Sequence, residues 1–338
     1  MVAPTEREVV QIAMAYAGFV HDRLVASAPG VTALRIDGNP GGPDGRSLRV
    51  TRRYLEDGHV QLRSEMVPAP NAAADDISVP ASHDGVRVGT VTIETTGTNL
   101  ESPALLARLT RYARVTAAGL AADLPPDAWP TTLHGEVQTV VDHETHLGAH
   151  PERVAGYSRI IVAALRGPLG LTDDFTDAVD EYAPLHDVGE LAVGIDILTK
   201  PGRLGPDEWR LMQTHTTRGR RIVDVAVAEQ PELWARPDVL RAIVEAHHEA
   251  LDGSGYPHGL SGDAIPLEAR IVSVADVFDA LTSSRPYKSG WSADEALDEM
   301  DRMVRAGRID ALCLTALVTH PDLVEAVAAS AAEIRYES

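Results

Sequence analysis

The sequence predicts a protein of more than one domain, with a small α+β domain followed by an all-α helical bundle. Three observations predict this order. Strand-like alternation of apolar and polar residues occurs before residue 100. The run Asp123-Leu124-Pro125-Pro126 then interrupts the chain, because proline ends regular elements. Amphipathic helical patterns follow it. We therefore predict domains at residues 1–124 and 136–338, joined by a linker at 125–135.

The first domain is expected to run helix, strands, helix. Residues 6–26 carry apolar side chains at helical spacing, residues 47–66 and 85–95 alternate as strands do, and residues 102–122 repeat apolar side chains on one face. This order resembles a small GAF-type sensor domain over about residues 5–123. A PAS-like or other α+β module stays open. The helix at 102–122 either mediates a homodimer or packs on its own sheet.

Composition limits the partners and the location of the protein. The formal net charge of -20 disfavours binding to polymeric nucleic acid or to an anionic membrane surface, since both would be repelled. No apolar run approaches the ~20 residues that cross a bilayer, so we expect a soluble cytoplasmic protein. Cys313 is the only cysteine, so any metal must be held by His, Asp or Glu. Lys200 and Lys288 are the only lysines.

The second domain shows helical periodicity in a series of segments. Thr172 or Asp173, Pro206 and Ser292 are residues typical of helix starts. The expected helices are residues 150–166, 173–187, 206–228, 236–249, 266–283 and 292–306.

A set of histidines and aspartates in these helices predicts a metal site. His-Asp dipeptides also occur at His21 and His83, but without partners around them. Facing helices of a bundle can turn ligands toward one point, and this mixture of imidazole and carboxylate suits iron, manganese or another divalent first-row metal. A carboxylate such as Asp187 can bridge two ions, so we expect a dinuclear centre. The set comprises His150, His186, Asp187, His215, His247, His248 and Asp276.

Several short motifs, in order from His150 to Lys288, resemble the HD-GYP family of cyclic di-GMP phosphodiesterases, whose catalytic domain has an HD-type helical fold. The matching stretches are His150-Pro151-Glu152-Arg153-Val154, Leu185-His186-Asp187-Val188-Gly189, Ile197-Leu198-Thr199-Lys200-Pro201-Gly202, Met212 to His215 with Gly219, His247-His248-Glu249, Asp252-Gly253-Ser254-Gly255-Tyr256-Pro257, Val274 to Leu281 and Arg285-Pro286-Tyr287-Lys288.

The resemblance implies roles for individual residues. The seven residues of the predicted metal site match the family's ligands, with Asp187 as a catalytic residue. Arg285 and Lys288 would contact the substrate phosphate and act in catalysis, as expected of guanidinium and ammonium groups. The tripeptide Gly255-Tyr256-Pro257 would shape a loop beside the site and contact the substrate, and this loop could bind signalling partners.

A third metal is a further implication of the resemblance. Some members of the family bind one through a carboxylate four residues before the first ligand histidine, and His146 occupies that place here. His146 is thus a candidate ligand, Glu144 is a substitute candidate, and an ordinary loop histidine is the alternative.

Glu190 departs from the family pattern, which has lysine at this place against a substrate phosphate. Losing a charge-assisted hydrogen bond costs about 1.5–3 kcal/mol, and a carboxylate adds repulsion. Three functions therefore stay open. The first is hydrolysis of cyclic di-GMP to linear pGpG, or to GMP if a third metal assists, in bacterial second-messenger signalling. The second is a catalytically impaired module that binds metal and a nucleotide or partner, and the third is an HD hydrolase of another phosphoester.

Overall fold

The structure is a computed structural model, and its described residues form two compact units. Unit 1 comprises Met1–Gly148, Leu191–Arg203 and Ile222–Leu233, and unit 2 comprises Ala149–Glu190, Leu204–Arg221 and Trp234–Ser338. The described residues are 13, 31–38, 46–54, 60–68, 77–83, 86–95, 103–123, 137–141, 150–193, 195–198, 200, 202–283 and 290–332.

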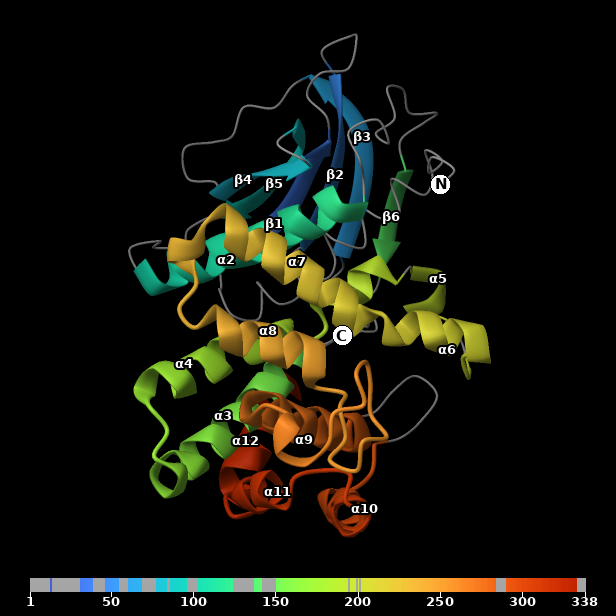
Figure 1. The fold of residues 1–338 in the computed structure, drawn as a ribbon. Helices are drawn as coiled ribbons and strands as arrows, with labels where there is room; N and C mark the ends of the chain where they lie inside the picture. Colours follow the sequence, from blue (N-terminus) through green and yellow to red (C-terminus); the bar gives the residue numbers. More distant parts are fainter. Residues whose placement is uncertain are drawn as a thin grey trace. The chain divides into compact units, whose positions relative to one another are not determined.

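Unit 1 contains an antiparallel sheet, which has six strands in the described part of the chain (Figure 1). The strand order is β4-β5-β1-β2-β3-β6. The strands are β1 (Val31–Gly38), β2 (Arg46–Tyr54), β3 (Val60–Pro68), β4 (Ile77–His83), β5 (Val86–Thr95) and β6 (Val137–Val141).

Several of these strands differ from the expectation. The stretch 47–66 forms two strands, β2 and β3, paired from Arg46 opposite Pro68 to Tyr54 opposite Val60. β1 and β4 were not expected. β6 lies in the segment predicted to be all-α, and that expectation is wrong there because Val137–Val141 pairs with the free edge of β3. The boundary at residue 136 stays a prediction.

Helix α2 (Pro103–Asp123) confirms the helix expected at 102–122 and packs against β4 and β5. Its apolar residues Leu109, Val115 and Leu120 are buried, as are Leu34 and Ile93 of the sheet. The helix thus packs on its own sheet, and dimerisation through it stays a prediction. The helix expected at 6–26 lies outside the described residues, apart from Ala13.

A network of ion pairs links β1, β2 and β5. Asp37 lies 3.0 Å from Arg35 Nε and 2.6 Å from Arg49 Nε, and Arg35 also contacts Glu94 at 2.8 Å. Asp37 and Arg35 are buried, so these pairs compensate for charges that would otherwise lack water.

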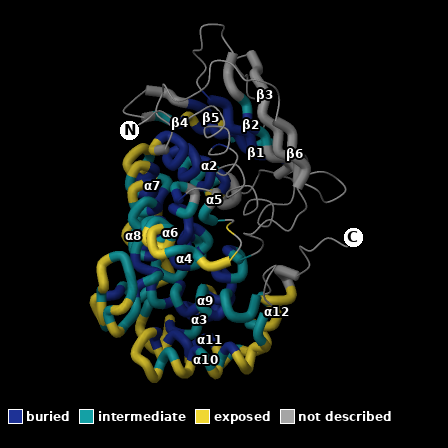
Figure 2. Tube along the Cα trace, turned by 90° about the vertical axis from the view of Figure 1, so that its right-hand side faces the viewer, coloured by how far each residue is buried: buried dark blue, intermediate teal, exposed yellow. Residues whose placement is uncertain are grey.

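Unit 2 is helical in its described residues. Helix α3 contacts α4, α9, α11 and α12, and α9 also contacts α8 and α10. The buried stretches of α3, α9 and α11 appear dark blue in Figure 2. The helices are α3 (His150–Leu169), α4 (Asp173–Tyr182), α6 (Pro206–Gln213), the start of α7 (His215–Glu229), α8 (Pro237–Ala246), α9 (Leu267–Thr282), α10 (Ala293–Arg305), α11 (Ala311–Val318) and α12 (Pro321–Ala332).

Two predicted helices are shorter than expected. The α-helix expected at 173–187 ends at Tyr182, because Pro184 has no N–H to continue its hydrogen bonding; Pro184 instead lies in the 3-10 turn η1 (Ala183–Leu185). The segment 206–228 is divided at Thr214 into α6 and α7. α11 and α12 were not expected. Short α5 (Ile195–Leu198) and the 3-10 turn η3 (Pro231–Leu233) belong to unit 1.

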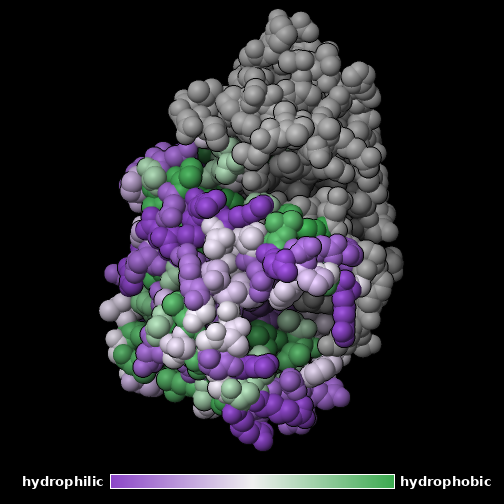
Figure 3. Space-filling view, turned by 45° about the vertical axis from the view of Figure 1, so that its right-hand side comes forward, coloured by the Kyte–Doolittle hydropathy of each residue, from purple (hydrophilic) through white to green (hydrophobic). Residues whose placement is uncertain are grey.

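The described surface mixes hydrophilic and hydrophobic side chains (Figure 3). Large apolar side chains exposed there include Trp209 and Leu323. Within the described parts of the chain, no individual helix has both the length and the apolar character of a membrane span, although one bent pair, Ala311–Val318 with Pro321–Ala329, passes by length and composition.

Candidate metal centre

The seven predicted ligands come together in unit 2 as two groups. Within each group, the potential ligand atoms all lie within 4.8 Å of one another. We call them the first and the second ligand group. The first consists of Asp187, His215, His247 and His248, and the second of His150, His186 and Asp276.

Ends of helices supply most of these side chains. His150 begins α3, and His215 begins α7 immediately after the break at Thr214. His247 and His248 directly follow α8. The second group also takes Asp276 from α9.

The His186-Asp187 pair lies in the turn between η1 and η2 (Val188–Ala192). Pro184 stops α4 just before this turn. Because α4 ends here, His186 and Asp187 do not follow its helical path, and the turn directs both side chains toward the site.

The carboxylate of Asp187 lies between the two groups. Its Oδ1 is 3.3 Å from His247 Nε2 and 3.4 Å from His215 Nε2. Its Oδ2 is 3.0 Å from His186 Nε2 and 3.9 Å from His150 Nε2. Each oxygen therefore faces a different group, which is an arrangement suited to a carboxylate shared by two cations.

Backbone carbonyls orient three of the histidines. Nδ1 of His186 lies 2.8 Å from Ala183 O, and Nδ1 of His215 lies 2.8 Å from Met212 O. Nδ1 of His247 lies 2.9 Å from Ile243 O. Since a carbonyl only accepts, each Nδ1 donates, and in the neutral form of each ring Nε2 keeps its lone pair toward the site.

His150 is oriented by a carboxylate instead. Its Nδ1 lies 2.7 Å from Asp279 Oδ2, while Arg153 holds both Asp279 oxygens at 2.5 and 2.9 Å. Burial acts to lower the pKa of His150, but the Asp279 hydrogen bond and the charge of Asp276 raise it overall. Asp279 thus orients His150, and Arg153 in turn holds Asp279 by an ion pair.

Burial and neighbouring histidines shift the pKa values of residues in the first ligand group. Burial, together with His247 and His215, lowers the pKa of His248 well below its usual range. Burial also lowers the pKa of His215. Burial would raise the pKa of Asp187, yet His186 and the other histidines hold it well below its ordinary value. The lowered pKa values of His215 and His248 favour neutral imidazoles, and that of Asp187 favours an ionised carboxylate, which are the forms that metal binding requires.

Among the described residues, two buried ligand atoms in this centre lack hydrogen bonds. In the described part of the chain, neither His186 Nε2 nor Asp187 Oδ1 has a hydrogen-bond partner. His186 Nε2 does lie 3.0 Å from Asp187 Oδ2, but not in hydrogen-bonding geometry. An unsatisfied buried polar atom costs about 1–3 kcal/mol. Coordination of a cation would remove this cost, so the residues fit divalent first-row metal ions.

Two glycines allow η2 and α7 to approach closely. A Cβ on Gly189 would lie 1.9 Å from His215 O and 2.4 Å from Gly219 N. A Cβ on Gly219 would in turn lie 2.7 Å from Val244 Cγ1. The missing side chains therefore bring the Asp187 turn against the start of the helix that carries His215.

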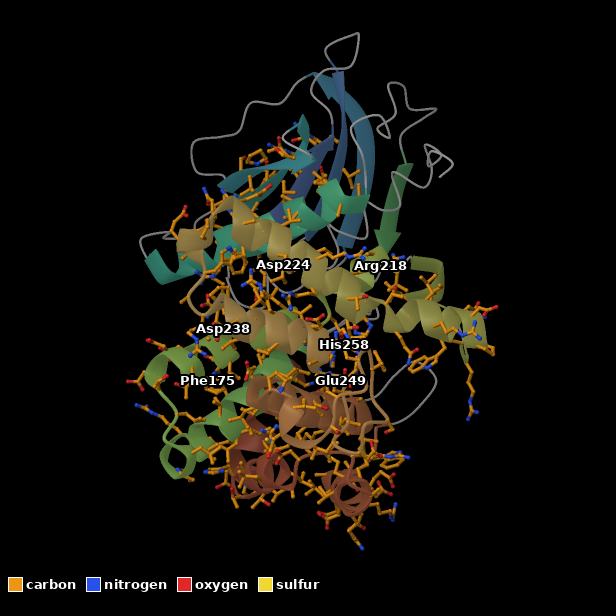
Figure 4. All side chains as sticks on the ribbon, in the orientation of Figure 1. Phe175, Arg218, Asp224, Asp238, Glu249 and His258 are labelled. Atoms are coloured by element: carbon orange, nitrogen blue, oxygen red, sulfur yellow. The ribbon has the colours of Figure 1, made fainter. Side chains whose placement is uncertain are left out.

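The loop after α8 is fastened by Glu249. This buried carboxylate accepts hydrogen bonds from the backbone N–H of His258 at 2.7 Å and of Leu260 at 2.9 Å. Figure 4 labels Glu249 and His258 near the end of α8. Gly255 is required in this loop, because a Cβ there would lie 2.3 Å from Ala250 N. Glu249 thus holds the loop through two backbone hydrogen bonds.

Tyr256 lies against the first ligand group. Its ring is 4.8 Å from the His248 ring at an interplanar angle of 33°, and it meets His215 edge to face at 6.1 Å. Pro257 follows it in the same loop. The structure thus places Gly255, Tyr256 and Pro257 beside the centre, and their contact with substrate stays a prediction.

Glu190 lies one turn after Asp187, and its N–H donates to Asp187 O at 2.9 Å. Burial and the charges of Asp187, Asp276 and Glu190 raise the pKa of Tyr256, so the Glu190 carboxylate acts on the same region. Arg285, Lys288 and His146, with Glu144, lie outside the described residues.

Sequence reasoning missed some features of the centre. The carbonyls of Ala183, Met212 and Ile243 leave no side-chain signal, although each lies three or four residues before its histidine. Trp209 was also missed, and its ring meets Tyr256 at 6.3 Å. Its place in the sequence, six residues before a predicted ligand, was the available signal.

A family profile described as HD domain matches residues 136–312, more than half of the chain. This chain belongs to the HD domain family. The predicted resemblance to the HD-GYP family is confirmed by this match together with the relatives below. The predicted GAF-like nature of the first domain is not confirmed.

Curated relatives are similar to part of this HD-GYP protein. One is the "Cyclic di-GMP phosphodiesterase response regulator RpfG" of Xanthomonas campestris pv. campestris, 44% identical over 151 residues, which are 44% of this chain and 38% of the relative. The "3'3'-cGAMP-specific phosphodiesterase 2" of Vibrio cholerae is 38% identical over 184 residues, 54% of this chain and 33% of the relative. A "Cyclic di-GMP phosphodiesterase" of Thermotoga maritima is 40% identical over 162 residues, 48% of this chain and 41% of the relative. The matched part therefore spans less than half of each of these relatives.

Proposed function

We propose that this HD-GYP protein is a metal-dependent phosphodiesterase that hydrolyses cyclic di-GMP to linear pGpG. The observation that carries the proposal is the position of the Asp187 carboxylate between the two ligand groups. Its Oδ1 faces His215 and His247, and its Oδ2 faces His186. The printed names of the relatives support a cyclic dinucleotide as the substrate class.

The first and second ligand groups would hold two divalent ions, iron or manganese by donor type. When bound, such ions activate water and stabilise the charge that develops on a phosphodiester. Asp187 would contribute one carboxylate oxygen to each group. The Nδ1 hydrogen bonds would keep three imidazoles from rotating. Arg285 and Lys288 would bind the substrate phosphate by charge-assisted hydrogen bonds.

Finer assignments are also part of the proposal. His146 would be a ligand for a third ion, with further cleavage of pGpG to GMP. The first domain, residues 1–124, would be a GAF-like sensory domain that mediates a homodimer, in a cytoplasmic signalling protein. The Gly255-Tyr256-Pro257 loop would be open to signalling partners.

The test is hydrolysis by protein loaded with iron or manganese. We expect linear pGpG from cyclic di-GMP by chromatography, and parallel reactions with 3'3'-cGAMP determine which cyclic dinucleotide is preferred. Asp187→Asn should lose both bound metal and turnover, measured by elemental analysis and chromatography. Asp207→Asn, a change at a side chain that is 92% exposed, is the matched control and should retain both. Full metal content in Asp187→Asn would contradict the shared-carboxylate role.

A second candidate is a binding module with little catalysis. Glu190 favours this candidate, because its carboxylate lies one turn after Asp187 and its charge contributes to raising the pKa of Tyr256. Tight binding of cyclic di-GMP to metal-loaded protein without linear product would support the module and contradict the hydrolase. Turnover of another phosphoester, with neither binding nor cleavage of cyclic dinucleotides, would support the remaining alternative.

A further inference from the structure

Trp209 on α6 is an exposed indole close to the candidate metal centre. Its side chain is 48% exposed. Its ring meets Tyr256 at 6.3 Å between centroids and at 81°, and Tyr256 lies 4.8 Å from His248. The Trp209 ring is therefore at most 11.1 Å, the sum of these two separations, from a ring of the first ligand group.

Packing does not account for this tryptophan. Tryptophan is among the most buried residues on average, and Trp234 of the same unit is 4% exposed beside Tyr182. None of the described side chains of α6 is buried, so the helix does not use Trp209 to fill a core. One side of the indole is supported by Tyr256, and about half of its surface stays available for another contact.

We propose that Trp209 is a stacking platform for a purine base of the cyclic dinucleotide, an inference that rests on the proposed function. A single sugar separates each phosphate of a dinucleotide from its base. A phosphodiester bound at the ligand groups thus brings a base toward the rings that flank the first group. Every base has a π-face, and aromatic side chains are the common platforms for it.

Removal of the indole should weaken substrate binding without slowing the chemical step. Stacking on a base far from the reacting phosphorus is present equally in the bound substrate and in the transition state, so its loss raises KM and leaves kcat unchanged. One base stacked on an aromatic side chain corresponds to a change of roughly 5- to 150-fold.

The experiment compares Trp209→Ala and Trp209→Phe with unaltered manganese-loaded protein. We expect Trp209→Ala to raise KM for cyclic di-GMP by roughly 5- to 150-fold with kcat within about twofold, and Trp209→Phe to retain most of the affinity. Inhibition by inorganic phosphate, which has no base, should be unchanged in both. Leu323→Ala is the matched control, since Leu323 is an apolar side chain of similar exposure, 52%, on α12.

Each outcome decides the inference. An unchanged KM in Trp209→Ala, in a preparation whose unaltered form is active, overturns the platform and leaves the proposed function standing. A lower metal content, weaker inhibition by phosphate, or an equal effect of Leu323→Ala overturns it in favour of a general structural effect. If the unaltered protein neither binds nor hydrolyses cyclic di-GMP, as shown by calorimetry and chromatography, the proposed function and the inference fail together.

Discussion

Glu190 places a negative charge within one turn of Asp187, where the sequence resemblance expects a cation. The Glu190→Lys change should therefore raise cyclic di-GMP turnover by roughly 10- to 100-fold, because a charge-assisted hydrogen bond to a phosphate contributes about 1.5–3 kcal/mol. The measurement is kcat/KM for linear product at equal metal content.

Glu190→Gln separates repulsion from the missing hydrogen bond. It removes the charge without supplying a cation, so its rate should lie between those of the unaltered protein and Glu190→Lys. An unchanged or lower rate in Glu190→Lys would mean that Glu190 does not limit catalysis.

The residues of the candidate site show what a sequence can reveal. Histidine and aspartate side chains at motif spacing predicted all seven members of the two ligand groups. The division into groups was not predictable, because it depends on how α3 and α9 pack and on the turn at Pro184. The carbonyl of Ala183 could not be predicted either, since any residue type provides one.

At the level of elements, the close approach of η2 to α7 leads to a prediction about Gly189. Gly189→Ala should lower Tm by roughly 2–12 °C, because a Cβ 1.9 Å from His215 O forces the two elements apart and overpacking costs about 1–3 kcal/mol. Metal content should fall too, since Asp187 directly precedes η2 and His215 begins α7.

Gly167→Ala is the control for this prediction. Gly167 lies in α3, and a Cβ there meets nothing within 4 Å. Its Tm should change by no more than about 2 °C. Equal shifts in both variants, measured by calorimetry, would show that the approach of η2 to α7 tolerates a side chain.

The pairing of α8 with α9 carries a pH dependence through Glu268. Burial, aided by the charge of Asp238, raises the pKa of Glu268, although Arg236 and Arg270 oppose it. The folded state therefore binds more protons than the unfolded state between the two pKa values, so the free energy of unfolding falls as pH rises through that interval. Glu268→Gln should be more stable than the unaltered protein at pH 7 and equal to it at about pH 4.

Urea denaturation at several pH values measures this difference. Glu325→Gln, on an exposed residue of α12, is the control and should not change stability. A Glu268→Gln protein that is less stable at pH 7 would show that the carboxylate is stabilised by its arginine neighbours.

The elements also show where sequence patterns predict structure well. Ser292 and either Thr172 or Asp173 were expected at helix starts, and Thr172 and Ser292 each accept a hydrogen bond at the start of α4 or α10. α11 was missed because Ala311–Val318 is mostly apolar and gives no clear periodicity. β4 was missed because Pro80 argues against a strand, although proline is tolerated at the edge of a sheet, where β4 lies.

At the scale of the whole molecule, the net charge of -20 opposes the approach of an anionic dinucleotide. Added salt screens this repulsion, and the Debye length falls to about 8 Å at 0.15 M. KM for cyclic di-GMP should therefore fall by up to about tenfold between low and physiological ionic strength, with kcat unchanged. Initial rates in sodium chloride measure it. A KM that rises with salt would indicate that local cations dominate the encounter.

If each ligand group binds a metal ion, the position of Asp187 between the groups would make the two affinities interdependent. A cation at one oxygen would fix the carboxylate for the second ion, but it would also reduce the negative charge that the second oxygen presents. By thermodynamic linkage, whichever effect is larger acts equally in both directions. Titration with metal should then give either a cooperative curve or two separated steps, and not the single hyperbola of two independent sites.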